Sequence, residues 1–100
     1  MNRRMPLVTA ERKVKGGKLF RIRVAVEGGR PESLRLTGDF FLFPEGAMSR
    51  LEEALLIDLA SGAYATRTRA LLESGELVLV GIGLSDLEDA LMEVRRRSGA

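Results

Sequence analysis

Cysteine and histidine are both absent from this 100-residue chain, and each absence excludes a class of function. Without cysteine there are no disulfides, no thiolate metal ligands and no thiol nucleophiles. Without histidine the chain lacks the commonest general base and the commonest neutral metal ligand. A metal site would need carboxylates alone, and the Asp and Glu residues do not cluster in a recognisable loop such as an EF-hand. We therefore expect no catalytic residues and no metal site.

Long apolar runs are also absent, so we expect no transmembrane helix and no membrane partner. Residues 1–8 include two arginines but no apolar stretch long enough for a secretory signal, which makes a cytoplasmic protein the expectation. The length, with 45% hydrophobic and 30% charged residues, predicts one globular domain over residues 1–100. Within it, residues 1–12 are either a flexible lead-in or an edge strand.

Charge is unevenly distributed along the chain. Residues 1–30 carry nine Lys or Arg against two acidic residues, whereas residues 31–100 carry seven against twelve. A basic face of this kind attracts nucleic acid, a phosphate-bearing ligand or an acidic protein surface. The alternative is a solvated strand face with a basic tail. Aromatic residues are only 5% of the chain and no nucleic-acid motif matches, which disfavours specific nucleic-acid binding.

Strict alternation over residues 18–26 predicts a strand with one buried face. Its inward residues are Phe20, Ile22, Val24 and Val26. Gly28 and Gly29 follow, and paired glycines supply the positive φ angles of a tight hairpin. Residues 33–37 alternate again, with Leu34 and Leu36 inward. The pattern predicts an antiparallel hairpin, and residues 7–14 are either a third, edge strand or a basic lead-in.

Three helices are predicted after the hairpin, over residues 47–60, 63–74 and 85–97. Ser85, with Glu88 three residues on, forms a capping box, and this helix start could instead bind an anion. Residues 76–83 read as a short buried strand or an extended connector. The fold class is therefore α+β: a small antiparallel N-terminal sheet of two to three strands, covered on one face by about three helices.

The segment Lys15-Gly16-Gly17-Lys18 is the strongest candidate for ligand contact. Two glycines let the backbone bend close to a ligand while two ammonium groups flank it, an arrangement that suits a phosphate or a carboxylate. The alternative is a flexible turn between strands, with both lysines in water. Residues alone leave both interpretations open.

The stretch from Lys13 to Leu55 resembles the small accessory subunit of two-part lipoate–protein ligases, a module also found as the C-terminal domain of single-chain ligases. The matching pieces are Gly-Gly-Lys-Leu at 16–19, Gly-Asp-Phe-Phe at 38–41 and the acidic, leucine-rich helix that follows. Residues 80–91 match in kind, as a short apolar segment before a capped helix. The order and spacing of these pieces carry the resemblance, which spans roughly residues 13–97.

This resemblance implies a non-catalytic subunit that docks on the large, catalytic subunit. The pair would form lipoyl-AMP from lipoate and ATP (with Mg) before lipoyl transfer to lysines of acceptor domains, which this chain serves indirectly. The chain alone would bind no cofactor. Under this resemblance, Lys15 and Lys18 are the best candidates to approach the nucleotide. The resemblance also makes Asp39, Phe40 and Phe41 candidates for the core or for the partner interface.

The same hairpin, turn and helix order also resembles the iron–sulfur scaffold (SufE/NifU-like) fold. In that fold the turn carries a cysteine, and a chain without cysteine cannot ligate a cluster in this way. Two functions from other classes stay open beside the ligase subunit. One is a stand-alone protein-interaction module, and the other is a basic nucleic-acid-associated module.

Overall fold

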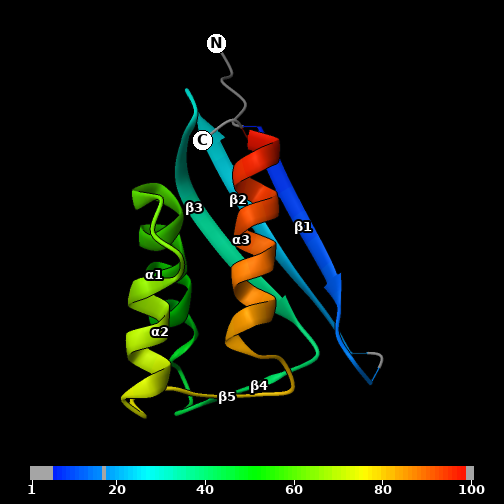
Figure 1. The fold of residues 1–100 in the computed structure, drawn as a ribbon, viewed down its shortest axis with the longest axis vertical. Helices are drawn as coiled ribbons and strands as arrows, with labels where there is room; N and C mark the ends of the chain where they lie inside the picture. The colour runs from blue at the N-terminus through cyan, green and yellow to red at the C-terminus, as the bar shows by residue number, and fades with distance from the viewer. Residues whose placement is uncertain (1–5, 17, 99–100) are drawn as a thin grey trace.

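A computed structural model describes residues 6–16 and 18–98. The element order is β1 (Leu7–Lys13), β2 (Leu19–Glu27), β3 (Arg30–Gly38), β4 (Phe41–Phe43), α1 (Met48–Ser61), α2 (Thr66–Glu73), β5 (Val78–Val80) and α3 (Leu84–Ser98). The strands form an antiparallel sheet in the order β1-β2-β3 and a separate ribbon of β4 and β5 (Figure 1). The α+β prediction is confirmed. No helix among the described residues is long and apolar enough to span a bilayer.

The predicted hairpin is confirmed by β2 and β3. The even-numbered residues from Phe20 to Val26 are buried, as are Leu34 and Leu36 opposite them. Gly28 and Gly29 form the turn with φ angles of 58° and 77°, values that a β-carbon disfavours. Alternation along these two strands therefore directs one face of the sheet into the core.

The N-terminal segment is an edge strand rather than a lead-in over residues 7–13. It pairs antiparallel with β2, with Ala10 opposite Ile22 and buried. The outer edges of the sheet also meet the helices. Glu52 of α1 accepts the backbone N–H of Leu36 at 2.8 Å, and Arg97 of α3 donates to the carbonyl oxygen of Thr9.

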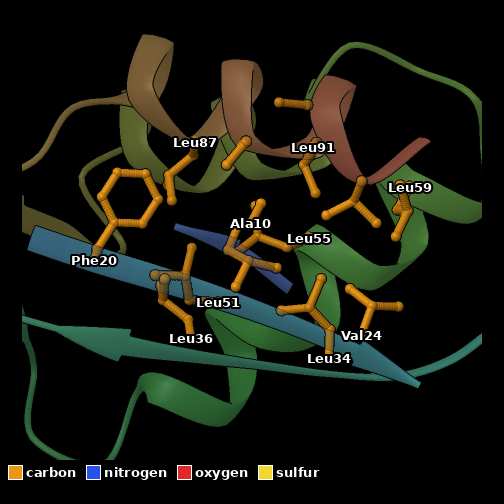
Figure 2. Packing of buried hydrophobic residues seen from close by; sticks show 14 of the residues in the cluster. Ala10, Phe20, Val24, Leu34, Leu36, Leu51, Leu55, Leu59, Leu87 and Leu91 are labelled. Carbon is orange, nitrogen blue, oxygen red and sulfur yellow. The ribbon is translucent and has the colours of Figure 1, made fainter. Parts of the chain in front are cut away.

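One face of the three-stranded sheet is covered by helices, as predicted, but by α1 and α3 rather than by all three, because α2 packs mainly on α1. α1 packs on β3, whereas α3 packs on β1 and β2. Their apolar stripes meet the inner face of the sheet in one cluster (Figure 2). Leu51 and Leu55 of α1 and Leu87 of α3 are fully buried there. Each buried side chain of this size stabilises the fold by about 1.5–3 kcal/mol.

The predicted start of the second helix, at residue 63, is wrong by three residues. Ala65 has a left-handed φ of 50°, and Tyr64 before it is 63% exposed. α2 begins at Thr66 because a carboxylate from another helix binds its first N–H groups. That cap comes from a residue distant in sequence, so local periodicity could not locate it.

The predicted N-cap of the last helix is also wrong. α3 begins at Leu84, so Ser85 lies inside its first turn. The carbonyl oxygen of Gly83 accepts from the N–H groups of Asp86 and Leu87, and the Asp86 carboxylate accepts the N–H of Gly83 at 2.8 Å. Gly83 therefore takes the N-cap position predicted for Ser85. Asp86, three residues later, takes the place of Glu88 in the capping box.

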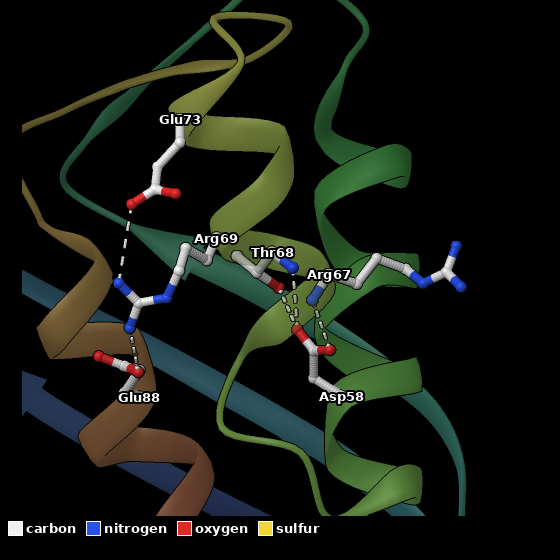
Figure 3. A network of polar contacts seen from close by, with 6 residues as sticks. All are labelled: Asp58, Arg67, Thr68, Arg69, Glu73 and Glu88. Carbon is white, nitrogen blue, oxygen red and sulfur yellow. Dashed lines mark hydrogen bonds and ion pairs between the residues drawn. The ribbon is translucent and has the colours of Figure 1, made fainter.

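Asp58 joins α1 to α2 through a buried polar network (Figure 3). Its side chain is 1% exposed and accepts the N–H groups of Arg67 and Thr68, each at 2.9 Å, and the Thr68 hydroxyl at 2.8 Å. Arg95 of α3 donates to the Asp58 carbonyl oxygen at 3.3 Å. One residue therefore caps α2 and connects the three helices.

We expect Asp58→Ala to lower the free energy of unfolding by about 2–4 kcal/mol, because two N–H groups and a hydroxyl lose their acceptor in the interior. Urea unfolding followed by circular dichroism measures this loss. Glu53→Ala, on an exposed position of the same helix, is the matched control and should change stability by less than about 0.5 kcal/mol. Similar losses in both variants would contradict a capping role for Asp58.

Candidate functional site

The lysine loop, residues 14–18, connects β1 to β2. The N–H of Val14 donates to the carbonyl oxygen of Lys18 at 2.6 Å and closes the loop. Lys15 and Gly16 are exposed, Lys18 is half-buried, and Gly16 has a φ of 94°. Gly17, the remaining predicted ligand contact, lies outside the described residues. The loop lies at the end of the molecule that also holds β4, β5 and the start of α3 (Figure 1).

Lys18 lies beside two segments that are distant in sequence. A β-carbon built on Gly81 would lie 3.4 Å from the Cδ of Lys18, from the carbonyl oxygen of Asp39 and from the Cα of Phe40. The lysine stem, the turn after β3 and the turn after β5 therefore meet at Gly81. Three of the predicted site residues are brought together here. Sequence reasoning missed Gly81, whose role depends on this meeting of three segments.

Gly38 allows the turn after β3 to approach β2 closely. Its φ is 152°, and a β-carbon there would lie 2.5 Å from the Cα of Phe20 and 2.6 Å from the carbonyl oxygen of Leu19. The next residue, Asp39, donates its N–H to that same oxygen at 2.8 Å. The Gly-Asp pair therefore ends the sheet at a contact that admits no side chain.

The two adjacent phenylalanines have different environments. Phe40 is half-buried and packs against the core cluster. Phe41 is 65% exposed on β4. Asp39, on the other side of the turn, is exposed as well. The structure thus gives Phe40 a core contact, whereas Phe41 and Asp39 face solvent, where a partner could reach them.

An exposed apolar face runs along the β4–β5 ribbon. The register pairs Phe41 with Val80 and Phe43 with Val78. The fractional exposures of these side chains are 65%, 48%, 52% and 49%, in that order. We call these four residues the ribbon face. Residues 76–83 were expected to be a buried strand or a connector; the strand is present, but two of its three side chains are exposed.

The inward side of the ribbon contacts the rest of the fold. Leu42 and Leu79 are paired with each other and pack against the core cluster. A hollow of about 330 Å³ lies next to β5, lined by residues of β5, the end of α2 and the start of α3. An isolated two-stranded ribbon is marginal in water, so these contacts hold it. The ribbon face remains open to solvent, next to the place where Lys18, the turn after β3 and Gly81 come together.

In the described part of the chain, no group of three acidic side chains could hold a metal ion. The start of α3, considered as an anion site, has the N–H of Gly83 occupied by Asp86. What the site offers is ammonium groups beside an apolar surface, which suits binding and covering of a ligand rather than proton transfer.

Comparison with known proteins identifies the relatives of this fold. No family model matches the chain. Subunit 2 of lipoate-protein ligase A from Thermoplasma acidophilum is 42% identical over 37 residues, which are 37% of this chain and 39% of that protein. The chain thus matches only about two fifths of this relative's length in sequence.

A solved structure extends the likeness to nearly the whole fold. It describes an archaeal lipoylation system from Thermoplasma acidophilum, a bipartite lipoate protein ligase and its E2 lipoyl domain. One of its chains superposes with a TM-score of 0.66 and 27% identity, over 87% of this chain and 96% of that one. The chain is thus similar in sequence to part of a lipoate-protein ligase subunit 2, and similar in fold to a chain of a bipartite lipoate protein ligase.

The resemblance deduced from the sequence is thereby confirmed. The lysine loop, the Gly-Asp turn and the ribbon face share one end of the molecule. Which of these residues contact a ligand or a partner stays a prediction. Lys15, Gly16 and Lys18, with Asp39 and Phe41, are accessible for such contacts.

We expect Gly38→Ala to lower the free energy of unfolding by about 2–4 kcal/mol, because the methyl group would collide with the backbone of β2. Gly29→Ala is the matched control, since its φ is also positive but no atom lies within 4 Å of the added carbon. That variant should lose only about 1 kcal/mol. Urea unfolding of both proteins checks the difference. Equal losses would show that backbone conformation, not the close contact, requires glycine at position 38.

Proposed function

We propose that this chain is the accessory subunit of a two-part lipoate–protein ligase. It would dock on a catalytic subunit and be needed for formation of lipoyl-AMP from lipoate and ATP, before lipoyl transfer to lysines of acceptor proteins. The observation that carries the proposal is the likeness to a chain of a bipartite ligase over 96% of that chain's length. The 42% identity to a ligase subunit 2 supports the same conclusion.

The chemistry of the exposed end is compatible with this role. Lipoyl-AMP combines an apolar acyl chain with an anionic phosphate. The lysine loop supplies ammonium groups that attract phosphate, and the ribbon face supplies apolar surface. We propose that this end covers the mouth of a pocket on the catalytic subunit. Covering the pocket would exclude water and hold the phosphates in position.

The predicted resemblance to the iron–sulfur scaffold (SufE/NifU-like) fold is more specific than the α+β fold class. We retain it as a hypothesis about shared topology. In this chain the Gly-Asp-Phe-Phe turn, residues 38–41, stands where that fold carries a cysteine. Shared topology would not bring shared function, because function depends on the groups at the site.

We expect an equimolar amount of this chain to switch on lipoate-dependent exchange between ATP and pyrophosphate by the matching catalytic subunit. Exchange reports adenylate formation alone, so it separates this step from transfer to an acceptor. A reaction without lipoate controls for other exchange. A rate that does not change when the chain is added would contradict the proposed function.

We expect Lys18→Ala to lower the exchange rate by about tenfold or more while leaving subunit affinity within about twofold, since the ammonium group is proposed to contact phosphate. Lys18→Met keeps most of the stem that lies on Gly81 and should show the same loss. Arg67→Ala, on α2, controls for loss of a positive charge.

Exchange assays and calorimetric titration of the two subunits measure the two effects separately. Equal losses in exchange and in affinity would place Lys18 at the subunit interface instead.

A further inference from the structure

One face of the three-stranded sheet is covered by α1 and α3, and no helix or strand of the described residues covers the opposite face (Figure 1). The register sets which side chains share that open face, since alternate residues point to opposite sides. They form four rows across the strands: Lys13 and Leu19; Glu11, Arg21 and Thr37; Thr9, Arg23 and Arg35; Leu7, Ala25 and Ser33. We call this surface the open face.

The centre of the open face places two positive charges side by side. Arg23 of β2 and Arg35 of β3 are direct cross-strand partners, and both are exposed. Among the described residues no carboxylate pairs with either guanidinium. The neighbouring Arg21 is paired with Glu11, its Nε lying 2.9 Å from the Glu11 Oε2. Like charges directly opposite each other destabilise a sheet, so this pair has a cost that an oppositely charged partner would remove.

We propose that the open face docks on an acidic surface of the catalytic subunit, an inference that rests on the proposed function. Arginine is enriched at protein interfaces and binds carboxylates through two parallel N–H groups. In its own row and in the row on one side, its neighbours on this face are the small side chains of Thr9, Ala25 and Ser33, whereas the row on the other side holds the Arg21–Glu11 ion pair. Two adjacent guanidinium groups in such surroundings match a cluster of Asp or Glu side chains.

The charge of the face decides between possible occupants. A second copy of this chain would bring arginines against arginines, which electrostatic repulsion opposes. A single-stranded nucleic acid is bound through aromatic side chains on which bases stack, and the four rows of the open face contain no aromatic residue. An acidic protein surface is the occupant that the side chains favour.

The position of the face favours the catalytic subunit over other acidic proteins. Lys13 and Leu19 form the last row, and the loop that connects them carries Lys15 and Lys18. The open face is therefore continuous with the loop proposed to approach the catalytic subunit's nucleotide. One partner can cover both surfaces at once, with arginines at carboxylates and lysines at phosphates.

The test is association of the whole chain with the catalytic subunit, followed by surface plasmon resonance over a range of salt concentrations. Arg23→Glu should raise the Kd by about tenfold or more at low salt, mainly through a slower association rate. Association of the wild-type chain should slow steeply with added salt, and that of the variant should depend less on salt. Arg35→Glu, on the partner strand, should behave alike.

Thermal stability separates docking from folding. Each single reversal replaces a repulsive cross-strand pair by an attractive one, so the melting temperature of the free chain should rise by about 2 °C while binding weakens. Arg67→Glu is the matched control, because it makes the same charge change on α2, which packs on α1 and α3. That variant should bind as the wild-type chain does.

Normal affinity and salt dependence of both reversed variants would overturn this assignment while leaving the proposed function intact. The same holds if the reversals spare subunit association but raise the KM for an acceptor domain or abolish binding to an RNA. A wild-type chain that does not associate with the catalytic subunit at all would overturn both proposals.

Discussion

The inner face of β2 packs into the middle of the core, and the rest of the molecule is arranged around it. Phe20, Ile22 and Val24 are fully buried in a cluster that also contains side chains of α1 and α3. Because successive residues of a strand point to opposite faces, the residues between them must point outward. Arg21 and Arg23 are therefore placed on the open side by the same packing that stabilises the fold. The alternation of β2 thus both buries the side chains that stabilise the fold and places the arginines on the surface.

Elements defined by their own periodicity could be predicted from the sequence. The hairpin and the apolar stripes of α1 and α3 follow from alternation and from helical spacing, and their bounds were located to within three residues. Features decided by residues farther along the chain could not be predicted. α2 begins where Asp58 of α1 caps it. The accuracy of the prediction thus reflects how local each interaction is.

The candidate site could likewise be predicted only in part. Lys15 and Lys18 could be selected from their flanking glycines, but the approach of the Lys18 side chain to Gly81 depends on where the turn after β5 lies, and β5 is held there by its pairing with β4. That pairing joins segments separated by the whole of α1 and α2, and no short pattern encodes it. It also determines that Phe41 is exposed while Phe40 packs on the core. The sequence therefore indicated the residues of this end of the molecule without their arrangement.

The contacts at the two sheet edges bear on how the free chain avoids aggregation. Unpaired backbone groups at an edge are templates on which other chains can add strands and aggregate. Here Glu52 occupies the N–H of Leu36 on one margin, and Arg97 occupies the carbonyl of Thr9 on the other. A foreign strand would have to displace an ionic side chain before it could extend the sheet. The polypeptide can thus keep the ribbon face exposed while resisting strand-by-strand polymerisation.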